Sequence, residues 1–269
     1  MTRELLLALG EANLAAAAAV CLALTLRRPA RRLFGATAAY ALWALVPAAM
    51  AATLLPARVV SIGEPTAIGG GAWNGALEAT AAFGSTATGP TLLAAALALW
   101  ILGAVGMAAL LASQQMRFLA DIDRGVAGPA VLGFLSPRMV TPADFEARFE
   151  PEERELVLAH ERVHLDRFDA QANALTAILR CVCWFNPFVH WGAHAMRLDQ
   201  ELACDAAVIA RHPEARRRYA EALLKTQLAV RPLPIGCTWP AGTRHPLTER
   251  IAMLKRSLPS LPRRLAAGA

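Results

Sequence analysis

"ELVLAHERVHLDRFD", Glu155 to Asp169, places His160, Glu161 and His164 in a segment otherwise rich in leucine, valine and charged residues. Residues four apart lie above one another on a helix, so both imidazoles can reach one point in space. Glu161 lies about 100° further round that helix, where its carboxylate can take a proton from a water at that point. This spacing is typical of a hydrolytic zinc site with His160 and His164 as ligands and Glu161 as general base.

The residues before the motif predict the helix that the motif needs. Pro151 stands where a first helical residue belongs, and Glu150, Glu152 and Glu153 lie near the positive end of the helix dipole. We therefore expect a helix that begins at Pro151 and carries both histidines on one face.

A catalytic zinc site also needs a third protein ligand and an open fourth position. Downstream, "HAMRLDQELACDAAVIA" is a helical, alanine-rich run that contains Glu201 and, one turn later, Asp205. Glu201 is the predicted third ligand, with Asp205 behind it. The alternative is that the motif residues are only polar groups on a solvated helix face, and the downstream Glu-x-x-x-Asp argues against it.

The order of "HERVHLDRFD", "CWFNPFVHW" and "RLDQELACD" resembles the membrane-embedded zinc metallopeptidases of the BlaR/MecR signal-transducer type, a branch of the gluzincins. The resemblance runs from about Val126 to about Leu254. It implies one zinc ion per chain, an orienting role for Asp205, a structural role for Asp169, and a helix starting at Asn186-Pro187 that delivers the glutamate.

Transducers of that family carry a penicillin-binding sensor after a fourth span, with a Ser-x-x-Lys nucleophile. Here no serine is followed by lysine at that spacing, and no long apolar run follows Asp205. We therefore expect a chain without the fourth span and the sensor. The resemblance implies a protein substrate, with a transcriptional repressor as one candidate. Loss of the sensor is compatible with a truncated gene, a split system with a separate sensor subunit, or a different stimulus.

The composition points to a membrane protein, because 56% of the residues are hydrophobic and the mean hydropathy is +0.38. Three apolar runs, residues 5–26, 33–55 and 91–112, are long enough to cross a hydrocarbon core about 30 Å thick as helices. The predicted domains are a membrane region, 1–112, with an outer loop at 56–90; a zinc metallopeptidase domain, 113–230; and a basic, proline-containing tail, 231–269.

Arginines predict the orientation of the spans. They crowd the first connection, while the loop at 56–90 holds only Arg58 against Glu64 and Glu78. The crowded positions are Arg27, Arg28, Arg31 and Arg32. We expect a multi-pass protein of the cell (inner) membrane, with the N-terminus outside and the peptidase domain in the cytoplasm.

The predicted fold is mainly α, with three transmembrane helices followed by a mostly helical, gluzincin-like cytoplasmic domain that contains a small β-hairpin. Residues 170–196 are apolar enough for a fourth span, but Arg180 and Pro187 favour two helices meeting at "FNPF". Short apolar runs broken by glycine and proline predict the hairpin. By the resemblance, Val131 to Val140 would be an edge strand that pairs with substrate.

Several further residues have open roles. His194 or Arg197 could donate to an oxyanion in the cleft, although the His190 and His194 pair is more often structural. The cysteines on the cytoplasmic side predict no disulfides. The basic tail either lies on an anionic inner leaflet or is solvated, and we expect contact with the lipid bilayer but no direct nucleic-acid binding.

Two functions fit these features. The first is a membrane-anchored zinc endopeptidase that hydrolyses a peptide bond in a cytoplasmic or membrane-near protein, as part of regulatory signalling. The alternative is a non-catalytic signalling or scaffold protein in which a fourth protein ligand closes the zinc site.

Overall fold

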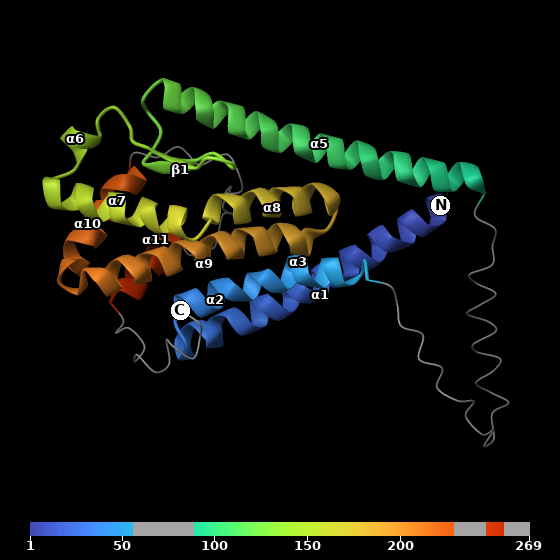
Figure 1. Ribbon diagram of the computed structural model, residues 1–269, viewed down its shortest axis with the longest axis horizontal. Coiled ribbons are helices and arrows are strands. Elements are labelled where there is room, and N and C mark those ends of the chain that lie inside the picture. Colours follow the sequence, from blue (N-terminus) through green and yellow to red (C-terminus); the bar gives the residue numbers. More distant parts are fainter. Residues whose placement is uncertain (56–88, 229–245, 256–269) are drawn as a thin grey trace, which may run out of the picture.

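The computed structural model describes residues 1–55, 89–228 and 246–255, and within them the fold is mainly helical with one small sheet (Figure 1). The predicted outer loop, except its last two residues, and most of the predicted tail lie outside these ranges. The longer helices are α1 (Thr2–Leu33), α5 (Pro90–Asp123), α7 (Pro151–Asp166), α8 (Asp169–Val182), α9 (Pro187–Arg211) and α10 (Arg216–Leu228). The shorter elements are α2 (Ala36–Ala41), η1 (Leu42–Ala44), α3 (Leu45–Ala52), α6 (Phe145–Arg148), η2 (Pro213–Ala215) and α11 (Pro246–Leu254).

The prediction of three spans is wrong for its second member. In the described residues, only α1 and α5 are long and apolar enough to cross a membrane. After Leu33, which ends α1, the run at 33–55 is helical between Ala36 and Ala52, because Gly35 adopts a φ of 103° before this segment and the chain turns at Thr53 after it. That is short of the roughly 20 residues that a span needs. Apolar composition continues past both ends of the helical segment, which is why the sequence suggested a longer one.

Helix α1 extends beyond the predicted first span. It continues through Pro29 to Leu33, so the four arginines from Arg27 to Arg32 lie in its last turns and not in a connecting loop. The helix packs against α2, α3 and α9. The basic end of α1 therefore lies against the helix that carries Glu201.

The predicted break at "FNPF" is confirmed, since α8 ends at Val182 and α9 begins at Pro187. The Asn186 side chain caps α9 by accepting a hydrogen bond from the backbone N–H of Phe188, at 3.1 Å. Helix α9 packs against α1, α2, α7, α8 and α11, and it lies in the centre of the helical stack in Figure 1. One rigid helix thus connects the membrane part with the candidate site.

The small hairpin is also confirmed. Strands β1 (Ala130–Leu132) and β2 (Arg138–Val140) pair antiparallel, with Ala130 opposite Val140. Both strands contact α7. The pairing of an edge strand with substrate stays a prediction.

Two apolar clusters hold the stack together. One joins α1, η1, α3 and α9 around Trp43 and Met196, and the other joins α7, α9, α10 and α11 around Tyr219 and Ile209. Because α9 contributes to both clusters, Glu201 and Asp205 are held at the second cluster by a helix that is anchored in the first.

Candidate metal centre

The predicted motif helix has the expected start and carries both histidines. Helix α7 begins at Pro151, and Glu150 and Glu153 form a reciprocal capping box. The Nε2 atoms of His160 and His164 lie 3.1 Å apart, with the two rings nearly perpendicular. Both Nε2 atoms therefore face one point beside the helix.

Helix α9 brings Glu201 to the same point. Its Oε2 lies 3.3 Å from His160 Nε2, and its Oε1 lies 3.7 Å from His164 Nε2. Donor atoms held about 2.0–2.1 Å from a tetrahedral zinc ion lie roughly 3.3–3.4 Å from one another. The three separations, two of which involve different oxygens of Glu201, lie on both sides of that value, so His160, His164 and Glu201 are spaced as a zinc ligand set would be.

The ring of His164 is fixed by a carboxylate at the start of α8. His164 Nδ1 lies 2.7 Å from Asp169 Oδ2, and Asp169 is almost fully buried. Burial opposes a charge on the ring, but the hydrogen bond to Asp169 prevails and raises the pKa of His164 well above its ordinary value in the metal-free protein. When Nδ1 donates to Asp169, the Nε2 lone pair is directed at the shared point.

The ring of His160 is fixed through a tyrosine. Tyr219 on α10 donates its hydroxyl proton to Asp205 Oδ1 at 2.7 Å, and the same hydroxyl oxygen lies 2.7 Å from His160 Nδ1. Since the hydroxyl has one proton, His160 Nδ1–H donates to the tyrosine oxygen. Its Nε2 is then left as an acceptor, and both histidines present the tautomer that a metal ion requires.

Arg250 on α11 completes this support. It makes two hydrogen bonds to Asp205, at 2.8 and 2.7 Å, and its Nη1 lies 3.1 Å from Glu201 Oε2. Burial alone would raise the pKa of Glu201, but the Arg250 charge lowers it well below its usual range, so the carboxylate is ionised. Asp205 thus orients His160 through Tyr219, and Arg250 links Asp205 to Glu201.

Sequence reasoning missed Tyr219 and Arg250. Tyr219 lies in the predicted peptidase domain without an assigned role, and Arg250 lies in the predicted basic tail, yet only 6% of the surface of Arg250 is exposed. One available signal is that the chain contains only two tyrosines, and both turn out to contact carboxylates behind the histidines.

Glu161 is buried, with 8% of its surface exposed, and it directly follows His160 on α7. Arg197 donates a hydrogen bond to Gln200 at 3.2 Å, and His194 is partly buried on the same helix. The roles of Arg197 and His194 as oxyanion donors stay predictions.

Cys204 is the buried neighbour of this cluster. Its sulfur lies 3.4 Å from His164 Nδ1 and 3.5 Å from Asp169 Oδ2, so these three residues form a second group with metal-ligand spacing. That group needs the ring nitrogen that already bonds to Asp169. Burial also raises the pKa of the Cys204 thiol to about 11, and a protonated thiol is a poor ligand.

Two histidines on one helix and a glutamate from another give the donor arrangement of the gluzincin class of metallopeptidases. The chain belongs to the BlaR1 peptidase M56 family, whose sequence profile matches residues 7–124 and 113–254. This result confirms the predicted resemblance.

Individual relatives match a shorter stretch. The regulatory protein BlaR1 of Bacillus licheniformis is 31% identical over 101 residues, which cover 37% of this chain and 17% of that protein. The methicillin resistance mecR1 protein of Staphylococcus aureus is 28% identical over 116 residues, 42% of this chain and 19% of that protein. The matched part thus spans less than a fifth of these curated relatives. No solved structure matches the chain.

Proposed function

We propose that this chain is a membrane-anchored zinc endopeptidase that cleaves a cytoplasmic or membrane-near protein in a regulatory pathway. The observation that carries the proposal is the convergence of His160 Nε2, His164 Nε2 and Glu201 at zinc-ligand separations, with a carboxylate or tyrosine fixing each ring. The substrate class follows from the family, two of whose members are named as regulatory or resistance proteins. A transcriptional repressor is the first candidate.

In this proposal His160, His164 and Glu201 hold one zinc ion. When bound, zinc supplies Lewis-acid polarisation of the scissile carbonyl and acidifies a water. Glu161 would act as the general base that takes a proton from the attacking water and passes it to the leaving amine. Asp169 and Tyr219 keep the two rings oriented, and Arg250 keeps Glu201 ionised.

The scaffold alternative needs a fourth protein ligand. Within the described ranges, the group that surrounds both Nε2 atoms consists of three residues. Both ring nitrogens of His190 have other partners, since its Nδ1 accepts from Arg180 and its Nε2 lies 2.8 Å from the Trp184 carbonyl oxygen. This arrangement supports an open position and so favours the peptidase.

The ligand set is tested by zinc content. His160→Ala, His164→Ala and Glu201→Ala should each lose stoichiometric zinc in purified protein. If Glu201→Ala kept full zinc while His194→Ala lost it, the third ligand would be misassigned.

The chemistry is tested by Glu161→Gln, which keeps size and hydrogen bonding but removes the basic oxygen. It should retain zinc and lose cleavage by at least about 100-fold, the low end for a positioned general base. Glu155→Gln is the matched control, because Glu155 is exposed on the same helix. Cleavage products compared across the proteome between wild-type and Glu161→Gln cells identify the substrate. Equal cleavage by zinc-replete Glu161→Gln would refute the mechanism.

A further inference from the structure

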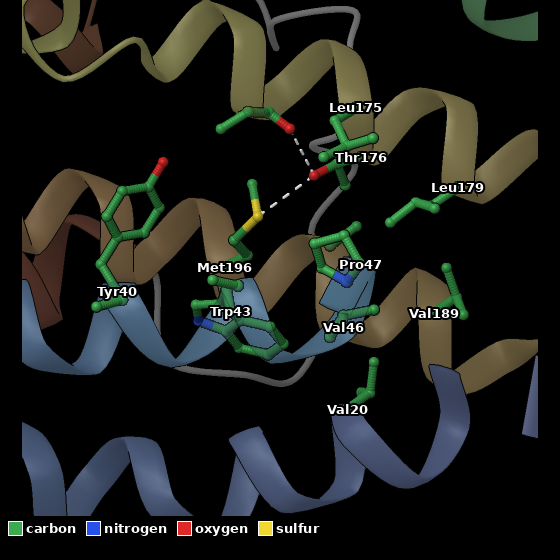
Figure 2. Close-up of a pocket in the computed structure, with 15 residues that line it drawn as sticks. Val20, Tyr40, Trp43, Val46, Pro47, Leu175, Thr176, Leu179, Val189 and Met196 are labelled. Atoms are coloured by element: carbon green, nitrogen blue, oxygen red, sulfur yellow. Dashed lines mark hydrogen bonds between the residues drawn. The ribbon is translucent and has the colours of Figure 1, made fainter. Parts of the chain in front are cut away.

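An apolar cavity of about 270 Å³ lies between α8, α9 and the segment α2–η1–α3, with α1 beneath it (Figure 2). This volume is close to the lower end of ordinary ligand sites, which run from about 300 to 1,000 Å³. Its walls are hydrocarbon, and the side chains that decide its shape are Val20, Trp43, Val46, Leu175, Val189 and Met196.

The polar groups in the wall are already engaged. The Thr176 hydroxyl donates to the Ala172 carbonyl at 2.8 Å, and the Trp43 indole N–H donates to Asp199 at 2.9 Å. The Tyr40 hydroxyl donates to Asp169 at 2.9 Å. A polar ligand or a water would therefore find few free partners, whereas a hydrocarbon chain needs none.

The cavity adjoins a surface of the same character. A shallower hollow of about 340 Å³ on the α2–η1–α3 segment, lined by Leu42 and Leu45, shares Ala41 and Ala44 with the cavity. Leu45 and Leu175 are 38% and 43% exposed, respectively. Exposed apolar side chains continuous with an apolar cavity mark a lipid-facing entrance beside a helix long enough to span a membrane.

The charge at the end of α1 indicates which lipid headgroup would bind beside the cavity. Arg28 and Arg32 are exposed in the last turns of α1, the end of that helix that is followed directly by α2 and Tyr40. Arginines at a membrane surface attract anionic headgroups. A lipid whose phosphate lies near these arginines can extend a chain toward the cavity.

Two wall residues connect the cavity to the candidate metal site. Tyr40 bonds to Asp169 Oδ1, while Asp169 Oδ2 bonds to His164 Nδ1 at 2.7 Å. Trp43 bonds to Asp199, which precedes Glu201 by two residues on α9. A molecule that packs against the Tyr40 ring therefore contacts the same side chain whose hydroxyl orients Asp169.

We propose that this cavity binds one acyl chain of an anionic membrane phospholipid, and that Tyr40 couples its occupancy to the orientation of His164. The binding stands by itself, whereas the coupling rests on the proposed zinc site. By thermodynamic linkage, lipid and zinc then strengthen each other's binding by the same factor. Partners behind a metal-bound histidine typically change metal affinity about 10- to 100-fold, so about tenfold is the expected coupling.

Lipid binding is measured on zinc-free protein in detergent by native mass spectrometry after incubation with phosphatidylglycerol. Wild type should retain one phosphatidylglycerol and discriminate against phosphatidylcholine. Ala172→Leu and Ala193→Leu fill the cavity from two different helices and should reduce retention at least tenfold. Ala52→Leu, on the exposed side of α3, should retain the lipid like wild type. Unchanged melting temperatures show that each variant is folded.

Coupling is measured as zinc affinity by chelator competition, with phosphatidylglycerol present and absent. Wild type should bind zinc about tenfold more tightly with the lipid. Tyr40→Phe keeps the ring in the wall but lacks the hydroxyl, so it should retain lipid and lose the tenfold difference. No lipid on wild type, or equal retention by a folded cavity-filling variant, overturns the site. Equal retention of phosphatidylcholine overturns the headgroup preference, and an unchanged difference in Tyr40→Phe overturns the coupling. A protein that binds lipid but no zinc would instead refute the proposed function.

Discussion

Replacing Arg250 with methionine tests whether α11 supports the candidate metal centre. The Arg250 side chain is 8% exposed, and its guanidinium makes two hydrogen bonds to the buried Asp205 and lies 3.1 Å from Glu201. Methionine keeps most of the side-chain volume but leaves two carboxylates without their cation. If Arg250 were an exposed tail residue, as its sequence context suggested, the substitution would have almost no effect on stability.

The expected loss of stability depends on which interactions Asp205 keeps in the variant. Removing one partner of a buried ion pair destabilises a fold by about 3–5 kcal/mol. Asp205 keeps the hydrogen bond from Tyr219, which places the expected loss near the lower end, at about 3 kcal/mol. For a chain of this size, each kcal/mol corresponds to about 2–4 °C in Tm, so Arg250→Met should melt about 6–12 °C below wild type.

The assay is thermal unfolding of purified protein in detergent with excess chelator, so that metal binding does not contribute to Tm. Arg217→Met is the matched control, because the Arg217 side chain is 92% exposed and pairs with Glu221 on its own helix. The control should shift Tm by at most about 2 °C. Equal Tm values for Arg250→Met and Arg217→Met would refute the assignment of α11 to the site.

Further outcomes follow from the geometry of the site and from the distribution of arginines. Zinc affinity should rise about tenfold for each pH unit below the pKa of His164. Burial lowers this pKa, but the hydrogen bond to Asp169 raises it by more, so the ring is charged in the metal-free protein. Zinc must displace that proton in order to bind. Asp169→Asn should move this rise to lower pH in a chelator competition series. Tyr219→Phe should weaken zinc binding about 10- to 100-fold, measured in the same way, since His160 loses its hydrogen-bond acceptor. A reporter that is active only outside the membrane should stay silent when fused after Ala112, and activity would reverse the predicted orientation.

Local signals in the sequence were sufficient for the elements that carry the metal ligands. The proline and glutamates before His160 predicted the start of α7, and Pro187 predicted the break at "FNPF", whereas the start of α9 at Asn186-Pro187 came from the family resemblance. These signals act over a few residues, through backbone hydrogen bonds at a helix end. They can therefore be recognised in the sequence without knowledge of the tertiary structure. Spacing of four residues likewise fixed the two histidines on one face.

The residues that hold the metal ligands in place could not be predicted from such local signals. Tyr219 and Arg250 lie 14 and 45 residues after Asp205, on helices α10 and α11, and no local motif links them to the metal ligands. Only packing decides which of several arginines turns inward. The prediction of the second span failed for a related reason, since composition measures hydrophobicity but does not show that Gly35 separates α1 from α2.

The arginines used to predict orientation also take part in assembling the site. Arg27 makes two hydrogen bonds to Asp199, at 2.8 and 3.0 Å, and Asp199 is fully buried two residues before Glu201. A buried carboxylate without its cation is costly, so α9 can pack in this register only beside the basic end of α1. Glu201 must therefore lie on the same side of the membrane as Arg27. If positive charge keeps that end of α1 in the cytoplasm, the buried ion pair keeps the candidate metal centre there as well.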